Sequence, residues 1–479
     1  MRVAGIIAEY DPFHRGHAYH IAKTREFADA VVAVLGGELT QRGEPAWCSK
    51  NLRARCALAC GADLVLELPA YYALGSAERF AGGGVRVLSA LGCVDYLSFG
   101  SESGNAADIA AFAALSDSGE FISEVKKRQK EGFSAPAARQ KAAEALAPEL
   151  AAVCKSPNDT LGAEYCKWLL RFGGKIEPVA VKRRGALHGE APCRNGFASA
   201  SFLRSLPKPA EALPYLPAEI RGMIIEEYAA GRLPVIREKY EVAALSRLRA
   251  MKEEDFAAVP DCAAEGLYHR VYEASRRAGT LDGFYSMIKT KRYAMSRIKR
   301  IAAAAAIGLD EEVFGDGGLP YVRVLGMNET GAQILKKAKQ ANTGIPIGAS
   351  LAELARTSER AAAFAAAESA AELLNFTEIS LKEGIYTEKK CGCRGSKGKN
   401  YIPGRITLDL NGKEVSNREL ACRSCAYKKR GDTLSCLIFE QKPEEVLAGG
   451  ECEKYLQDGS GLSGKKGGCG SCGECGECR

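Results

Sequence analysis

The sequence of 479 residues contains no run of about 18 apolar residues, which excludes an ordinary membrane-spanning helix. Residues 1–7 are apolar but lack the charged lead-in, long apolar core and cleavage site of a signal peptide. There is no internal repeat of fixed period. A strong excess of one charge is also missing, because 66 Lys and Arg residues face 59 Asp and Glu residues. The net charge of +7 permits an RNA partner without demanding one. We expect a cytoplasmic protein.

Cysteine is scarce along most of the chain and dense at its end. Eight of the 18 cysteines are scattered before residue 391, and in a reducing cytosol we interpret them as small buried hydrophobic residues. The other ten include C-x-x-C pairs, which suit tetrahedral Zn²⁺ coordination. The terminal run at i, i+3 spacing also suits an iron–sulfur cluster, and a disordered metal-scavenging tail is the alternative. The first candidate ligands are Cys391, Cys393, Cys422 and Cys425.

The first hundred residues alternate short apolar runs with helical segments. Strand-like runs lie at 3–9, 30–35, 63–68 and 94–99, a further one at 175–181, and an apolar island at 321–325. Unbroken Val- and Leu-rich runs between helices predict a parallel sheet covered on both faces, with ligands at the carboxyl ends of its strands. The predicted fold class is α/β. We divide the chain into a Rossmann-like nucleotide-binding domain (1–208), a mainly helical domain (209–385) and a Cys-rich extension (386–479).

The clearest local motif is His14-Arg15-Gly16-His17, between the first strand-like run and the first predicted helix. Three of the five histidines fall within seven residues there, a pattern that is not typical of a core. A metal-binding or merely exposed cluster is the alternative interpretation. A helix N-terminus favours an anion, and Gly16 lets phosphate approach the backbone closely. Imidazoles can donate hydrogen bonds to phosphoryl oxygens as negative charge develops on them. The motif therefore predicts a nucleotide site in which His14 and His17 are catalytic.

A strand, then H-x-G-H, then a helix resembles the nucleotidylyltransferase superfamily with its HIGH signature. The second element of that superfamily is a Ser/Thr-rich turn that ends in Arg or Lys, and residues 197–204 (FASASFLR) match it. The resemblance makes Ser199, Ser201 and Arg204 the phosphate-facing groups, with Arg204 counted as catalytic. Taken alone, S-x-S-x-x-R is also the pattern of an ordinary helix N-cap.

Over roughly residues 1–385 the chain is similar to the bacterial tRNA(Met) cytidine acetate ligase family. The matching segments follow one another in order: 9–17 (EYDPFHRGH), 41–46 (QRGEPA), 61–69 (GADLVLELP), 76–78 (SAE), 99–102 (FGSE), 156–158 (SPN), 182–183 (KR), 290–293 (TKRY) and 320–326 (PYVRVLG). The resemblance implies that ATP activates acetate as acetyl-adenylate and that pyrophosphate leaves. The acetyl group then passes to the wobble cytidine of elongator tRNA(Met), which gives N4-acetylcytidine and AMP. The implied cofactor is ATP with Mg²⁺, and the implied partners are elongator tRNA(Met), ATP and acetate.

The resemblance also implies a set of nucleotide-binding residues. They are Ile7, Ala8, Glu9, Tyr10, Asp11, Pro12, Phe13, His14, Arg15, Gly16, His17, Ala18, Tyr19, His20, Gly100, Asn158, Arg183, Arg184, Ser199 and Ser201. Asn158 can present both a donor and an acceptor to a base edge. Gln41 and Arg42 follow the second strand, and Arg42 can hold either polyphosphate or the acetate carboxylate.

Two positions depart from the family pattern by gaining a carboxylate. Asp11 replaces the usual Asn of E-Y-N-P-F-H, and Glu38 lies in Gly36-Gly37-Glu38-Leu39, where the family reads S-G-N-F. Like charge weakens anion binding unless a metal or an arginine compensates. Our hypothesis is that Mg²⁺ contacts one of these acids.

A tRNA substrate requires a basic surface, and residues 289–300 (KTKRYAMSRIKR) carry six Lys or Arg. A solvated surface helix is the alternative by composition alone. The predicted RNA-binding residues are Lys291, Arg292, Arg297, Lys299 and Arg300. Two other functions stay open at this point: a small-molecule nucleotidylyltransferase that needs no RNA, and a nucleotide-sensing RNA-binding protein without catalysis.

Overall fold

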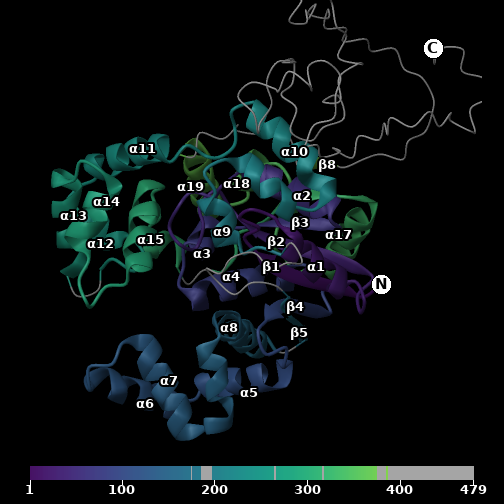
Figure 1. The fold of residues 1–479 in the computed structure, drawn as a ribbon, viewed down its shortest axis with the longest axis horizontal. Coiled ribbons are helices and arrows are strands. Elements are labelled where there is room, and N and C mark those ends of the chain that lie inside the picture. The colour runs from purple at the N-terminus through teal and green to yellow at the C-terminus, as the bar shows by residue number, and fades with distance from the viewer. Residues whose placement is uncertain (174, 185–196, 264–265, 316–317, 375–384, 387–479) are drawn as a thin grey trace, which may run out of the picture. The chain divides into compact units, whose positions relative to one another are not determined.

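An eight-stranded sheet forms the centre of the computed structural model, which describes residues 1–173, 175–184, 197–263, 266–315, 318–374 and 385–386 (Figure 1). The strand order is β5-β4-β1-β2-β3-β6-β7, with β8 also paired to β6. The strands are β1 (Val3–Ala8), β2 (Ala30–Gly36), β3 (Leu64–Leu68), β4 (Tyr96–Ser101), β5 (Glu177–Lys182), β6 (Val322–Met327), β7 (Ile347–Gly348) and β8 (Ile385–Tyr386).

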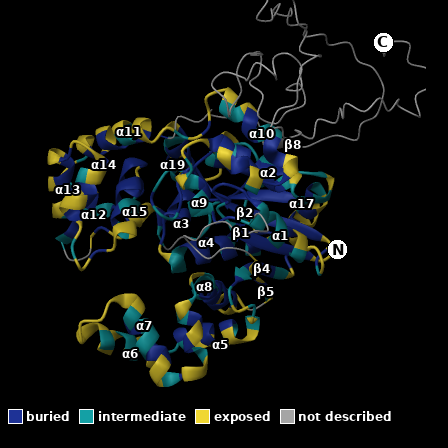
Figure 2. Ribbon diagram, viewed as in Figure 1, coloured by how far each residue is buried: buried dark blue, intermediate teal, exposed yellow. Residues whose placement is uncertain are grey.

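The five strands from β5 to β3 run parallel, as the unbroken apolar runs predict. β2 and β3 are wholly buried, and these two strands are dark blue in Figure 2. The chain leaves β1 toward β2 and β3 on one side and returns to β4 and β5 on the other. The strand order therefore reverses between β1 and β4, and the carboxyl ends of these two strands frame a ligand crevice.

Helix α4 (Ala77–Ala90) shows how closely the helices cover the sheet. A Cβ on Gly84 would lie 2.5 Å from Cδ1 of Ile7, and one on Gly82 would lie 2.4 Å from Cε2 of Trp168. Glycine at these positions lets α4 lie directly against β1 and against α8 (Pro157–Arg171). The backbone of α4 thus approaches β1 and α8 at positions where a larger side chain would keep them apart.

The remaining elements are helical. Close to the sheet are α1 (Arg15–Thr24), α2 (Lys50–Ala59), α3 (Ala70–Ala73), α9 (Ala200–Ser205) and α17 (Glu329–Ala341). The insert between β4 and β5 holds α5 (Ala106–Ser116), α6 (Gly119–Lys130), α7 (Ala135–Leu146), η1 (Pro148–Lys155) and α8. A further group holds α11 (Arg237–Ala250), α12 (Glu253–Ala258), α13 (Leu267–Arg277), α14 (Leu281–Ile288) and α15 (Met295–Ala306), which pack on one another (Figure 1). The others are η2 (Pro209–Tyr215), α10 (Ala218–Ala229), α16 (Glu311–Phe314), α18 (Leu351–Ala355) and α19 (Glu359–Leu374).

The structure confirms the predicted α/β class. It adds that the apolar island at 321–325 is β6, which pairs antiparallel with β3 and extends the sheet with a strand from beyond residue 208. The described residues up to Pro217 and from Gly231 onward belong to one compact unit, whereas α10 belongs to another. The division at residues 208 and 385 stays a prediction, and the Cys-rich extension lies outside the described residues except for its first residue, Tyr386. No helix in the described part of the chain is long and apolar enough to cross a membrane.

Candidate nucleotide-binding site

A pocket of about 700 Å³ opens at the point where the strand order reverses. It is lined by the N-terminal turn of α1, the ends of β4 and β5, the N-terminus of α8 and the α9 turn. The predicted site residues that line it are His14, Gly16, His17, Tyr19, His20, Arg42, Gly100, Asn158, Arg183, Arg184, Ser199, Ser201 and Arg204. Segments that lie far apart in the sequence thus meet at one crevice.

Ten of the residues predicted to bind the nucleotide or acetate do not line the pocket, and several of them pack against the residues that do. They are Ile7, Ala8, Glu9, Tyr10, Asp11, Pro12, Phe13, Arg15, Ala18 and Gln41. Tyr10 and Phe13 are buried, and both rings pack against the ring of His17. Glu9 accepts a hydrogen bond from the backbone N–H of Gln41 at 2.7 Å, which ties the end of β1 to the loop after β2.

The two histidines of the motif cap α1 reciprocally. His14 is the N-cap, and its Nδ1 accepts from the Gly16 N–H at 3.0 Å, while Nδ1 of His17 accepts from the His14 N–H at 3.3 Å. The rings stack with centroids 3.7 Å apart. Because both Nδ1 atoms act as acceptors, the proton of each neutral ring must sit on Nε2. Each imidazole therefore has one N–H donor left for a ligand.

Burial and neighbouring cations keep these rings uncharged. Burial, followed by the positive charges of Arg183 and Arg204, lowers the pKa of His14 to about 3. The pKa of His17 lies well below its ordinary value, chiefly through burial. Burial and Arg183 lower the pKa of His20 to about 4. At neutral pH the site thus offers neutral imidazole donors beside permanent guanidinium charges, an arrangement that suits a polyanion.

The third histidine is held inside the fold. Nε2 of His20 lies 2.9 Å from Oγ of Ser98 on β4, and that hydroxyl lies 2.8 Å from Oγ1 of Thr24. Thr24 in turn donates to the carbonyl of His20 at 2.9 Å. This closed set of contacts fixes the helix against β4, so we interpret His20 as a positioning residue for the pocket wall.

The α9 turn combines capping with exposure to the pocket. Ser199 is the N-cap and accepts from the Phe202 N–H at 3.2 Å, while its Oγ lies 3.0 Å from Oγ of Ser201. Arg204 donates to the carbonyl of Asp11 and so ties α9 to the motif loop. The capping role of Ser199 is therefore observed, and its place beside phosphate stays a prediction that its position in the pocket lining allows.

Asp11 is a buried acid whose charge is balanced by arginines. Its Oδ1 accepts from the Trp47 N–H at 2.6 Å, and its Oδ2 lies 2.9 Å from Arg42 and 3.5 Å from Arg204. Asp11 adds a negative charge where the family pattern has Asn, and the arginines Arg42 and Arg204 compensate that charge. Arg42 keeps 39% of its side chain exposed and lines the pocket, so it still faces a ligand.

Comparisons with known proteins identify the fold and the family. A family model described as HIGH Nucleotidyl Transferase matches residues 1–383. The tRNA(Met) cytidine acetate ligase of Clostridium novyi is 35% identical over 361 residues, which cover 72% of this chain and 89% of the relative. That of Caldicellulosiruptor saccharolyticus is 39% identical over 350 residues, which cover 71% and 86%. The chain belongs to the tRNA(Met) cytidine acetate ligase family.

Solved structures agree with this assignment. The crystal structure of Thermotoga maritima TmcAL bound with alpha-thio ATP is similar with a TM-score of 0.69 and 31% identity, covering 77% of this chain and 92% of that one. The apo structure of the same protein matches with a TM-score of 0.69 and 32% identity. A member of the family thus binds an ATP analogue on this fold.

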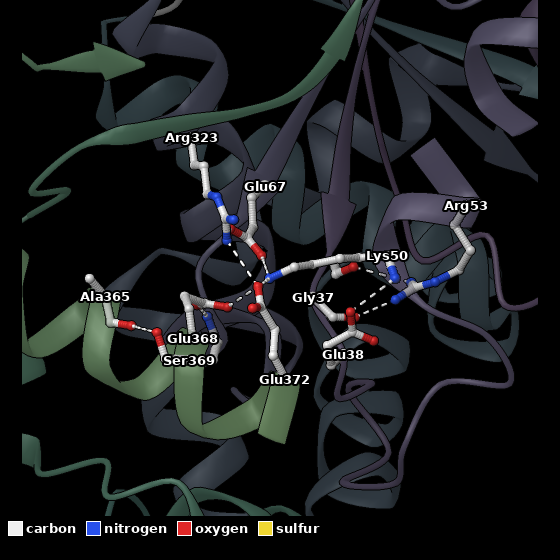
Figure 3. Close-up of polar contacts among 12 residues, drawn as sticks. Gly37, Glu38, Lys50, Arg53, Glu67, Arg323, Ala365, Glu368, Ser369 and Glu372 are labelled. Atoms are coloured by element: carbon white, nitrogen blue, oxygen red, sulfur yellow. Dashed lines mark hydrogen bonds and ion pairs between the residues drawn. The ribbon is translucent and has the colours of Figure 1, made fainter. Parts of the chain in front are cut away.

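The second departure from the ligase family, Glu38, does not line the nucleotide pocket. It is 2% exposed, burial raises its pKa, and its Oε1 accepts from the Lys50 N–H at 3.2 Å. Our expectation of a carboxylate beside the polyanion is therefore wrong for Glu38. Nearby Arg53 is 1% exposed and donates to the carbonyls of Glu9 (2.6 Å) and Gly36 (3.1 Å) at the carboxyl ends of β1 and β2. It also donates to the carbonyl of Gly37 (Figure 3).

A buried ionic cluster joins the sheet to α19. Figure 3 shows Lys50 and Arg323 converging on three carboxylates, Glu67, Glu368 and Glu372. Lys50 contacts Glu67 closely and lies 2.7 Å from Glu372, and Arg323 lies 3.1 Å from Glu67. The two cations lower the pKa of Glu67 to about 2 against the effect of burial. Burial and the charge of Glu67 raise the pKa of Glu368 to about 8. We assigned Glu67 no catalytic role from the sequence, and the structure makes it part of this cluster.

The predicted RNA-binding residues divide into two groups. Lys291 and Arg292 are exposed in the loop before α15. Arg297 donates to the carbonyl of Asp261 at 2.7 Å, and Lys299 pairs with Glu44 at 2.5 Å. Arg300 is partly buried, and burial lowers its pKa. Three of the five predicted residues thus take part in packing within the chain.

The same helix supports the loop that carries Arg42. Gly43 has φ +74°, and a Cβ there would lie 2.3 Å from the carbonyl carbon of Lys299. The backbone of the loop therefore rests directly on α15. The sequence did not indicate this contact, nor the pocket-lining residue Lys155. Glu102 and Ser156 lie in the matching segments 99–102 and 156–158, but we did not assign them to the site. Among the residues that the structure describes, no cluster of His, Cys, Asp and Glu suited to a metal is present, and all four predicted cysteine ligands lie outside them.

Proposed function

We propose that this chain is an ATP-dependent ligase that acetylates the wobble cytidine of elongator tRNA(Met). Membership of the tRNA(Met) cytidine acetate ligase family supports the activity. The observation that carries the proposal is the pocket itself. In it the histidine motif, the Ser199 turn and Arg204 face one crevice at the switch point of the sheet.

In the first half-reaction an oxygen of acetate attacks the α-phosphorus of ATP. Acetyl-adenylate forms as the bond to pyrophosphate breaks. The Nε2–H groups of His14 and His17 donate to the phosphoryl oxygens as negative charge builds on them, and Arg183 and Arg204 stabilise the departing pyrophosphate. Because the imidazoles are neutral and already oriented by the α1 cap, they need no reorganisation during the step.

In the second half-reaction the N4 amine of the cytidine attacks the acetyl carbonyl. The amine loses a proton, N4-acetylcytidine forms, and AMP leaves. Arg42 is assigned to the acyl side of the pocket because Asp11 already neutralises part of its charge. A single acetate carboxylate needs less positive charge than a polyphosphate does.

Mg²⁺ is the metal expected with ATP in this family. Glu102 is the only acid among the described residues that line the pocket, and both of its oxygens accept from Asn158. Asp11 is paired with arginines. These residues do not fit a dedicated Mg²⁺ site, so our hypothesis of an acid–metal contact loses its support, and we derive no step through the metal.

For the RNA partner we retain Lys291 and Arg292 as the first residues to test. They are exposed, and they precede the helix on which the Arg42 loop rests. The positively charged side chains of Lys291 and Arg292 suit contact with phosphates of the tRNA backbone.

The test is ATP–pyrophosphate exchange with acetate, with and without bulk tRNA, followed by mass spectrometry of the tRNA nucleosides. We expect acetate-dependent exchange and N4-acetylcytidine. Both should be lost in His17→Ala and kept in His269→Ala, which removes an exposed histidine on α13. Pyrophosphate exchange with other carboxylates but not with acetate would refute the proposal that acetate is the substrate. ATP binding without exchange would refute catalysis.

A further inference from the structure

The end of β4 and the start of α8 are fastened to each other by two carboxylates. Asp159 on α8 is buried and accepts from the backbone N–H groups of Glu102 at 3.0 Å and Ser103 at 3.2 Å, and from the hydroxyl of Ser101. Glu102 accepts in return from two groups of Asn158. These reciprocal hydrogen bonds of Asp159 and Glu102 fix the loop after β4 against the N-terminus of α8.

The contacts of Glu102 determine how the Asn158 amide is oriented. One carboxylate oxygen accepts from the backbone N–H of Asn158 at 3.2 Å, and the other accepts from its side-chain Nδ2. A carboxylate has no proton to give, so the atom of the amide that faces it must be the nitrogen. The amide oxygen is the atom left over, and it has no partner within the described part of the chain. Both residues line the nucleotide pocket.

We propose that Glu102 sets the nucleobase selectivity of the pocket by holding Asn158 with its amide oxygen toward the base. This inference rests on the proposed ATP site. A free asparagine can pair with adenine through both its amide atoms. Here Glu102 occupies the nitrogen, and only the acceptor remains. The pocket then takes a base that presents a donor, such as the exocyclic amine of adenine, and rejects a base that presents a carbonyl at the same position.

The penalty for the wrong base comes from two opposed acceptors. Inosine triphosphate (ITP) differs from ATP by carrying a carbonyl in place of the 6-amino group. Its oxygen would face the Asn158 oxygen, and neither could find a donor without moving. A site built around one hydrogen bond discriminates by at least about tenfold against such an analogue. Selectivity for ATP over ITP therefore depends on Glu102 preventing the Asn158 amide from rotating to exchange the positions of its oxygen and nitrogen.

The experiment measures binding of ATP and of ITP by isothermal titration calorimetry to the full chain and to three variants. Wild type should bind ATP at least about tenfold more tightly than ITP. Glu102→Ala frees the amide to rotate, so ITP binding should tighten relative to ATP and the ratio should approach one. Glu102→Gln can still hold the loop, but its amide accepts either orientation of Asn158, so the ratio should fall in between. Glu149→Gln, on an exposed acid of η1 outside the pocket, should keep the wild-type ratio.

The ratio separates selectivity from mere structural support. If Glu102→Ala weakens both nucleotides equally, Glu102 only supports the fold and the proposal is overturned. Equal binding of ATP and ITP by wild type would overturn it as well. A ratio that shifts as expected in a protein that fails to acetylate tRNA would uphold this inference and refute the proposed function. Binding of neither nucleotide would refute both.

Discussion

Replacing Glu368 by glutamine should remove a pH dependence of stability from the buried cluster in Figure 3. The cluster holds three carboxylates against two cations, so one carboxylate is in excess. Glu368 takes the proton that relieves this excess, since burial and Glu67 raise its pKa to about 8. Glutamine is a permanent neutral mimic of that protonated state. It can also keep the hydrogen bond from the Ala70 N–H, which is 2.6 Å long.

The direction of the pH dependence follows from the state, folded or unfolded, in which Glu368 holds its proton more tightly. The folded protein keeps the Glu368 proton up to about pH 8, whereas the unfolded chain loses it near its ordinary value of 4.5. The stability from this group is fully present below pH 4.5 and is lost as pH rises through 8, at about 1.4 kcal/mol per pH unit. Between pH 5.5 and 8.5 the wild type should therefore lose about 3 kcal/mol relative to Glu368→Gln.

Urea denaturation of both proteins at the two pH values measures this difference. All other titrating groups are shared, so their contributions cancel in the comparison. Glu359→Gln, at an exposed position on the same helix, is the control and should follow the wild type at both pH values. A stability difference between Glu368→Gln and wild type that is the same at pH 5.5 and 8.5 would show that Glu368 does not carry the excess proton.

Three further outcomes follow from the contacts described above. Gly43→Ala places a Cβ against the backbone of Lys299 at positive φ, so it should cost about 1–3 kcal/mol in urea denaturation and lower kcat/KM for pyrophosphate exchange. Unchanged exchange would argue that the loop does not position Arg42. Asp11→Asn removes the charge that partly neutralises Arg204 from 3.5 Å, so ATP should bind several-fold more tightly in calorimetry, and weaker binding would contradict this electrostatic reasoning. Lys50→Met leaves three buried carboxylates with one cation and should destabilise the fold by about 3–5 kcal/mol, whereas a neutral effect on the urea midpoint would exclude a net-charged cluster.

The sequence predicts the central sheet because each of its parallel strands is a local signal. An apolar run bounded by helical segments is visible in about ten residues, and the position of the histidine motif between a strand and a helix is equally local. These features place His14 and His17 at the carboxyl edge before any contact is known. The strand order and the return to β4 then bring Gly100 and Asn158 to the same edge.

Features that depend on partners far along the chain were not predictable in this way. The pairing of Lys299 with Glu44 joins positions 255 residues apart, so a basic stretch cannot reveal that its charges are already engaged. Asp11 likewise reads as an unfavourable charge until Arg42 and Arg204 are seen beside it. The orientation of Asn158 depends on Glu102, and neither residue type indicates that contact by itself.

The antiparallel pairing of β6 with β3 has a consequence for the order in which the protein is made. Glu67 on β3 and Arg323 on β6 are 256 positions apart, so at ordinary rates of translation β3 waits roughly ten to fifty seconds for its neighbour β6. During that interval the β3 edge is open and Lys50 lacks the carboxylates of α19. An open edge strand is a template for pairing with other chains. The nascent chain therefore remains exposed to misassembly at this edge even after Arg204, the last of its predicted nucleotide-site residues, has been made.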